Sequence, residues 1–157
     1  MSSATTPRYK DASYGGVYSA VVSKLSRSGV TIGRTAHVPR IEVHTITEGE
    51  RLDKVGDVRQ LSLTVECIGN ASLADTASVN DKNVELLSQG LDLETGWRCI
   101  GIIPDQLQDL TETSDTNKIL YRLLQGFTIW VERVKTQENT EEAEESVQEE
   151  PAQETNE

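Results

Sequence analysis

Residues 119–131 read ILYRLLQGFTIWV and form the longest strongly apolar run in the chain. In a strand, successive side chains point to opposite faces of the sheet. One face of this run would carry a continuous apolar set: Ile119, Tyr121, Leu123, Phe127, Ile129 and Val131. The run therefore predicts a strand at the centre or at the closing position of a sheet, with Gly126 marking a bulge or a bend.

The opposite face of this predicted strand is mixed. Beside polar and charged residues it carries three large apolar side chains: Leu120, Leu124 and Trp130. A strand with one wet face would be polar at these positions. We therefore expect a second, partial burial, either under another element of the same chain or under a neighbouring subunit.

Two helices are predicted N-terminal to this strand. The first follows Ser13 and carries an apolar stripe at helical spacing, made of Tyr14, Val17, Tyr18, Val21, Val22 and Leu25. The second follows Ser72 and Asp75, which resemble a capping box, and ends at Gly90. It has a loose stripe of Leu73, Ala77, Val84 and Leu87, and its middle, SVNDKN, forms helix poorly, which predicts a break.

Three further strands are predicted. Residues 41–47 and 58–68 are expected to pair as a hairpin, with Ile41 and Val43 on one face of the first strand and Ile46 on the other. Residues 97–103 form the next strand, which Pro104 should end. Residues 105–117 are either a short strand or an extended arm. The fold class is therefore α+β: a mixed, mainly antiparallel sheet of about four strands, flanked by two helices.

The charge divides the chain into one domain and two tails. Residues 136–157 hold nine Glu and neither Lys nor Arg, so most of the net charge of −11 lies there. We expect a flexible arm at 1–12, a single domain at 13–134 and a disordered acidic tail at 135–157. This acidity argues against groove-type binding of nucleic acid, which needs clustered Lys and Arg.

No secretion signal or bilayer-spanning run is visible, so we expect a soluble, non-secreted protein with no membrane partner. The two cysteines, Cys67 and Cys99, lie in apolar strand patterns and are expected to be small buried hydrophobic residues. A core of roughly 120 residues with few aromatic side chains is only modestly stable alone, which favours an oligomer.

Motifs that carry chemistry are scarce. Glu42 and His44 would point to one side of a strand, but a metal site would still lack two ligands. The acidic residues between 105 and 115 are expected to form a solvated loop. No nucleophile, base and orienting group can be assembled. We therefore expect no catalytic residue, no cofactor and no metal.

The order of the elements and three C-terminal segments resemble the tail-terminator (tail-completion) proteins of long-tailed bacteriophages. In that family a strand is followed by a linker and a long closing strand of the form R…L…F.I.V. Here the pattern falls on Trp97–Ile103, Asp105–Asn117 and Arg122–Val131. The resemblance covers about residues 13–134, whereas the N-terminal arm and the acidic tail depart from the family pattern.

The resemblance implies a structural virion protein and no enzyme. It implies a ring, usually of six copies, that caps the tail tube and joins it to the head connector or neck protein at the head-proximal end of the tail. Such a ring would assemble in the host cytoplasm, and genomic DNA would pass through it without specific binding. The near-neutral body of this chain is compatible with such a channel.

A head-to-tail ring needs two different surfaces on each subunit. We expect the face with Leu120, Leu124 and Trp130 to supply one, and the charged hairpin tip with Glu48, Arg51 and Lys54 to supply the other. Two alternatives stay open. One is a head–tail connector or neck protein. The other is a small ligand- or protein-binding module with a cleft lined by Trp97, Trp130 and Tyr121.

Overall fold

The structure is a computed structural model, and it describes residues 16–51 and 58–134. The predicted arm at 1–12, the predicted helix cap Ser13, the tip residue Lys54 and the acidic tail at 135–157 lie outside these residues. The described elements follow in this order: α2 (Val17–Leu25), the 3₁₀-helix η2 (Ser26–Ser28), β1 (Thr31–Ile32), β2 (Arg40–Arg51), β3 (Val58–Gly69), α3 (Leu73–Ser88), β4 (Trp97–Asp109), β5 (Glu112–Thr113) and β6 (Ile119–Arg133).

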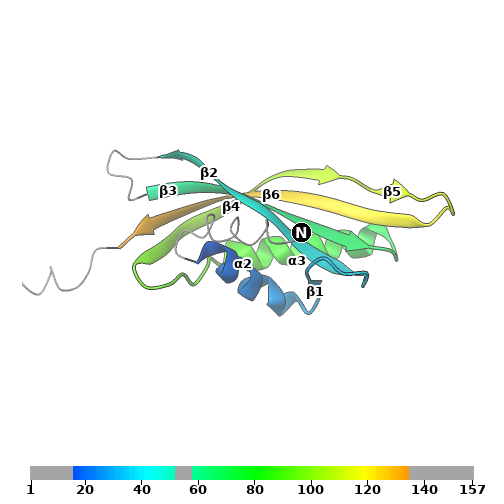
Figure 1. The fold of residues 1–157 in the computed structure, drawn as a ribbon, viewed down its shortest axis with the longest axis horizontal. Helices are drawn as coiled ribbons and strands as arrows, with labels where there is room; N and C mark the ends of the chain where they lie inside the picture. Colours follow the sequence, from blue (N-terminus) through cyan, green and yellow to red (C-terminus); the bar gives the residue numbers. More distant parts are fainter. Residues whose placement is uncertain (1–15, 52–57, 135–157) are drawn as a thin grey trace, which may run out of the picture.

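One sheet, with both helices on the same side of it, makes up the fold (Figure 1). The strands lie in the order β1-β2-β3-β6-β4, and β5 pairs with β6 beyond the end of β4. All pairs are antiparallel except β1 with β2. The predicted α+β class is confirmed. The described part has six strands rather than about four because β1 and β5 are two-residue strands.

The core lies between the helices and the inner face of the sheet. The helix α2 begins at Val17, and its N-cap is Gly16 rather than the predicted Ser13. The side chains of Val17, Val21 and Leu25 are fully buried, and Tyr18 and Val22 pack partly buried against the core, which confirms the predicted stripe for the described residues. They face apolar residues that alternate along the two central strands, including Leu61 on β3 and Ile129 on β6. This period-2 alternation places every second side chain in the core and leaves the outer face of the sheet, here called the open face, without a helical cover.

The last strand, β6, is central in the sheet, as predicted, but Gly126 does not mark a bulge in it. The register with β3 runs without a shift from Val58↔Glu132 to Gly69↔Tyr121. The irregularity lies on the other neighbour, β4, between Pro104 and Leu107. A Cβ atom on Gly126 would lie 3.5 Å from the backbone oxygen of Gln106, in ordinary van der Waals contact with the bulged strand.

The prediction that Pro104 ends a strand was wrong, because β4 continues to Asp109. Proline lacks the N–H that a ladder needs, and it is tolerated at the edge of a sheet and at bulges. In the described part of the chain, β4 pairs with β6 alone and has a register shift just after Pro104. Both conditions hold here, so the strand passes through the proline.

The predicted break in the second helix was also wrong, since α3 is continuous from Leu73 to Ser88. Its N-cap is Ser72, whose Oγ accepts a hydrogen bond from the backbone N–H of Asp75 at 3.0 Å, as the sequence predicted. Two of the poor helix formers are buried against the sheet: Asn80 donates to Gln125 and Asn83 donates to Cys67. Tertiary contacts therefore outweigh the low helix propensity of this segment.

The apolar stripe predicted for this helix was only partly right. Leu87 is fully buried, but Leu73 is 44% exposed. The buried positions are Thr76, Asn80, Asn83, Leu86 and Leu87, so the N-terminal half of α3 contacts the sheet through polar side chains.

The prediction for Ile46 was wrong as well. It lies in the core with Ile41 and Val43, because the register shifts between Val43 and Ile46. An extra residue at a bulge moves the following side chain to the opposite face. Neither α2 nor α3 is long and apolar enough to cross a membrane.

Candidate functional site

The three apolar residues proposed for a subunit contact share the open face of β6, with Leu120 near the start of the strand and Trp130 near its end. Leu124 and Trp130 alternate with buried core residues, whereas Leu120 lies between the exposed Ile119 and the partly buried Tyr121. All three side chains are themselves partly buried. Beside Leu124 and Gly126 the surface has a hollow of about 250 Å³, where β4 bulges away. Part of the surface of these three side chains stays exposed in the described chain. The second burial predicted for this face is therefore incomplete among the described residues.

Of the charged residues proposed for the second surface, Glu48 is the one whose side chain the structure describes. Glu48 accepts a hydrogen bond from Nη1 of Arg59 at 2.8 Å across the β2–β3 hairpin, so its charge is balanced within the chain. Arg51 is the last residue of β2 and is opposite Arg59 in the register. Lys54 lies outside the described residues.

The edge strand β4 presents a surface that the sequence analysis missed. Ile100, Ile103 and Leu107 are each about half exposed, at 52%, 53% and 51%. A strand that ends at Pro104 would not contain Leu107, whereas the observed β4 carries all three residues along one edge. The apolar residues at 100, 103 and 107 are spaced by three and four, which is not a strand period, because β4 has register shifts between Cys99 and Gly101 and between Pro104 and Leu107. No local pattern therefore indicated this surface.

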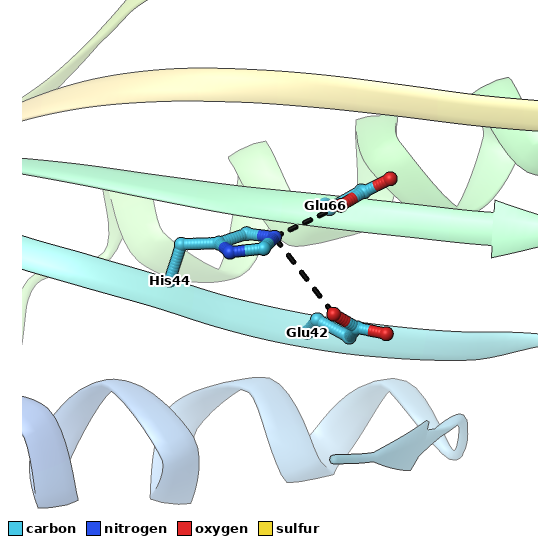
Figure 2. Close-up of side chains that lie close together, drawn as sticks. All are labelled: Glu42, His44 and Glu66. Carbon is cyan, nitrogen blue, oxygen red and sulfur yellow. Dashed lines mark hydrogen bonds and ion pairs between the residues drawn. The ribbon is translucent and has the colours of Figure 1, made fainter. Parts of the chain in front are cut away.

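A group of charged side chains lies on the open face of β2, β3 and β6. Figure 2 shows Glu42, His44 and Glu66 converging from the two strands of the hairpin. Nε2 of His44 lies 2.9 Å from Oε1 of Glu66 and 3.9 Å from Oε1 of Glu42. The sequence had paired Glu42 with His44 alone, and the antiparallel register brings in Glu66, which lies opposite Glu42.

These three residues offer one nitrogen and two oxygen atoms within 4.8 Å of one another, which is close enough for a metal ion. However, each carboxylate already has a cationic partner. Nε of Arg40 donates to Oε2 of Glu42 at 2.8 Å, and Nε of Arg122 donates to Oε2 of Glu66 at 2.5 Å. A divalent cation would have to bind beside these arginines and against their repulsion. The arrangement therefore favours a network of ion pairs over a metal centre.

Glu66 is the most buried member of the network, with 2% of its surface exposed. Burial alone would raise the pKa of its carboxyl group, but the hydrogen bonds from Arg122 and His44 outweigh burial and hold the pKa below its ordinary value. Arg122 also donates to Glu112 at 2.8 Å, and its partnership with Glu66 raises its own pKa. The network thus joins β2, β3, β6 and β5 on the open face.

Neither cysteine has the surroundings of a nucleophile. Cys67 is buried, and burial raises the pKa of its thiol to about 12. Such a thiol is almost fully protonated near neutral pH, and thiolate is the reactive form. Cys99 is partly buried against the core.

The cleft required by the binding-module alternative does not form. Trp130 lies on the open face, opposite Gly101, whereas Trp97 packs against the core and is covered by the guanidinium of Arg133 at 5.0 Å. Tyr121 lies near the other end of β6, at the level of Gly69. The three aromatic side chains are therefore spread over two faces and both ends of the sheet.

Comparisons with known proteins show a likeness in fold but no match in sequence. No protein-family model matches the sequence, and no curated protein matches it. The fold is similar to that of a chain in the structure titled "Virion of native gene transfer agent (GTA) particle", with a TM-score of 0.62 and 16% sequence identity. The match covers 76% of this chain and 97% of that chain. At this identity, the likeness establishes a shared fold.

Proposed function

We propose that this protein is a structural, non-enzymatic virion subunit that assembles head to tail into a ring. We further propose that the ring, of six copies, is a tail terminator. It would cap the tail tube at the head-proximal end, contact the tail tube protein on one side and the head connector on the other, and let DNA pass through its channel.

The observation that carries this proposal is the pair of long sheet edges. Among the described residues, the outer edge of β4 pairs with no strand, and it exposes Ile103 and Leu107. At the opposite edge of the sheet, β1 pairs only with Arg40 and Ile41 of β2. Among the residues that the structure describes, β2 therefore has no strand on its outer side from Glu42 onward. Unpaired edges with apolar side chains are sites where another chain adds.

The strand directions suit a head-to-tail contact between copies. Because β2–β3, β3–β6 and β6–β4 are all antiparallel, β2 and β4 run in opposite directions. If the sheet continues into the next copy, β4 of one subunit lies antiparallel to β2 of its neighbour. This contact joins two different edges and is therefore heterologous. Such contacts close into a ring when the rotation from each subunit to the next brings the last copy back to the first.

Two further observations support the virion assignment. The sequence resembles tail-terminator proteins over about residues 13–134, and the similar fold described above belongs to a chain of a virion particle. The described residues also carry groups suited to contacts between proteins. These groups are ion pairs and half-buried apolar side chains, and the buried thiol of Cys67 is unreactive.

Native mass spectrometry and electron microscopy of the purified full chain test the proposal. We expect ring-shaped particles with the mass of six chains. Added to tail tubes that lack a terminator, the protein should bind at one end of each tube and stop further growth.

A protein that stays monomeric at every concentration tested, and never associates with tail tubes, would exclude this function. Rings that bind isolated head connectors but leave tube ends free would instead point to a neck protein, the alternative that the sequence left open.

A further inference from the structure

One edge of the sheet and the segment leading into it are basic. Residues 16–40 contain Lys24, Arg27, Arg34 and Arg40 and no Asp or Glu. Lys24 lies on α2 and Arg27 on η2, which contacts α3, whereas Arg34 follows β1 and Arg40 is the first residue of β2. On this side of the sheet β1 is the outermost strand. Arg27 is exposed, and the side chain of Arg34 is 78% exposed. Glu42 pairs with Arg40 at 2.8 Å and lies 3.8 Å from Arg34, so it offsets part of this charge.

The opposite edge is acidic. Residues 105–118, at the end of β4 and through β5, carry Asp105, Asp109, Glu112 and Asp115 against a single base, Lys118. Every residue of this segment is exposed. Of the four acids, Glu112 alone has an ion pair in the described part of the chain, with Arg122. Asp105 accepts a hydrogen bond from Oγ1 of Thr128, and Asp109 accepts one from the backbone N–H of Thr111. Neither partner is a cation, so the negative charge of these exposed carboxylates is not neutralised by an ion pair.

The register places these two edges at the same level of the sheet. Ile32 on β1 pairs with Ile41, Ile41 with Cys67, Cys67 with Leu123, and Leu123 with Asp109. One row across the strands therefore begins at the basic edge and ends at the acidic edge. Figure 1 shows the same arrangement, with β1 and β5 toward the same end of the strands. Copies that join edge to edge without sliding along their strands bring the two charges together.

We propose that the acidic edge of one copy docks against the basic edge of the next, and that this pairing sets the direction and the register of the ring seam. The inference rests on the proposed function and names the residues that make the contact. The partner that binds the acidic edge is a second copy of this chain. The opposite edge of each copy is basic, and the strand register places it at the same level as the acidic edge. Exposed Ile103 and Leu107 lie on the same edge as the acids and supply apolar contact beside the charges.

Charge at a rim chiefly sets specificity and the rate of association, and like charges placed against each other oppose association strongly. An Asp109→Lys, Asp115→Lys variant would have two basic edges, and an Arg27→Glu, Arg34→Glu variant would have two acidic edges. Neither should form rings with itself. We expect each variant to associate about tenfold or more weakly than the natural protein at low salt.

Mixing gives the decisive measurement. In an equal mixture of the two variants, every seam can again join an acidic to a basic edge if the copies alternate. Rings of an even number should therefore reappear, each with equal amounts of the two variants by native mass spectrometry. A chain with all four substitutions has both edges reversed and should form rings by itself.

The matched control is Asp81→Lys, Glu85→Lys on α3, which changes the net charge as much as the first variant does. Both residues are exposed and lie on the helix layer, away from either edge. This control should assemble normally, and thermal melts should show that all variants fold.

The outcomes separate the two proposals. If the natural protein and all variants form rings equally well, the charged seam is wrong and the ring function stands. If the single-edge variants fail to assemble but neither the mixture nor the fourfold variant recovers, the seam is also wrong. If the natural protein forms no rings, the proposed function fails first.

Discussion

Arg122 on β6 donates a hydrogen bond from Nε to Oε2 of Glu66 on β3, with 2.5 Å between the two atoms. The pair lies on the open face, yet Glu66 is 98% buried because its neighbours cover it. A buried carboxylate stays ionised only when charged or polar groups replace the water that it has lost. Arg122 is thus the main group that allows Glu66 to be buried with a charge.

Replacing Arg122 with Met should destabilise the protein. Glu66 would lose its cationic partner, and removing one member of a buried pair leaves an uncompensated charge. We expect a loss of about 2–3 kcal/mol in the free energy of unfolding, less than for a fully buried pair because the Arg122 side chain is 30% exposed. Urea denaturation measures this loss. The matched control is Arg98→Met, whose partner is Glu132 and whose side chain is 68% exposed. It should cost about 0.5 kcal/mol or less, and equal losses in the two variants would contradict the argument.

The stability of the protein should depend on the ionisation of Glu66. Its pKa in the folded protein lies below the ordinary value of 4.5, so its contribution is complete above pH 4.5 and is lost as the pH falls through the folded pKa. The difference in unfolding free energy between the natural protein and Glu66→Gln should therefore be constant near neutral pH and shrink on acidification. Denaturation curves from about pH 7 to about pH 3 measure it. A difference that does not change over this range would show that the charge of Glu66 is not what stabilises the fold.

Substitutions on the open face should weaken assembly more than folding. Trp130→Ala and Leu124→Glu alter half-buried side chains that point away from the helices. We expect a lower fraction of rings by native mass spectrometry, with a smaller effect on the melting temperature. Leu73→Glu is the control, because Leu73 is 44% exposed on α3 rather than on the open face. If the melting temperature of the isolated subunit collapses in the first two variants, these residues belong to the core of one subunit.

Cys67 should resist alkylation in the folded protein. Burial raises the pKa of its thiol to about 12, and burial also blocks access for a reagent. Treatment with iodoacetamide at about pH 8 should leave Cys67 unmodified until denaturant is added. Peptide mapping by mass spectrometry distinguishes it from Cys99, which is only partly buried. Rapid native labelling of Cys67 would show that β3 and α3 separate readily at this point.

A side chain at Gly69 should destabilise the contact between β3 and α3. A Cβ atom there would lie 2.5 Å from Oγ1 of Thr76, a contact too close to persist without movement. We expect Gly69→Ala to lower the free energy of unfolding by about 1–3 kcal/mol. Gly101→Ala is the matched control, because a Cβ on that glycine of β4 meets nothing within 4 Å. Equal stability of the two variants would mean that α3 can shift without cost.

Much of the secondary structure could be predicted from side-chain periodicity. The alternation along Ile119–Val131 and the stripe of Val17, Val21 and Leu25 identify a central strand and a helix because each pattern has a single period. The cap at Ser72 was predictable because it needs only residues close in sequence. These features depend only on the backbone conformation of residues close together in the chain. The order of the residues is therefore enough to predict them.

Three predictions failed because neighbours distant in sequence decide the outcome. Pro104 lies within a strand because the strand is at an edge and bulges there, and Ile46 enters the core because β2 gains a residue relative to β3. The segment with Asn80 and Asn83 stays helical because Gln125 and Cys67 bond its side chains. No local rule contains these partners, so propensity alone gave the wrong answer.

The sequence by itself determined the α+β class and the two-sided final strand, because these follow from the type and spacing of residues. Only the tertiary structure decided which residues meet across strands. It joined Glu66 to His44 and Arg122 and placed the basic and acidic segments on opposite edges at one level. The physical reason is strand register: a shift of one residue changes both the partner and the face of every side chain, and only the packed sheet fixes that shift.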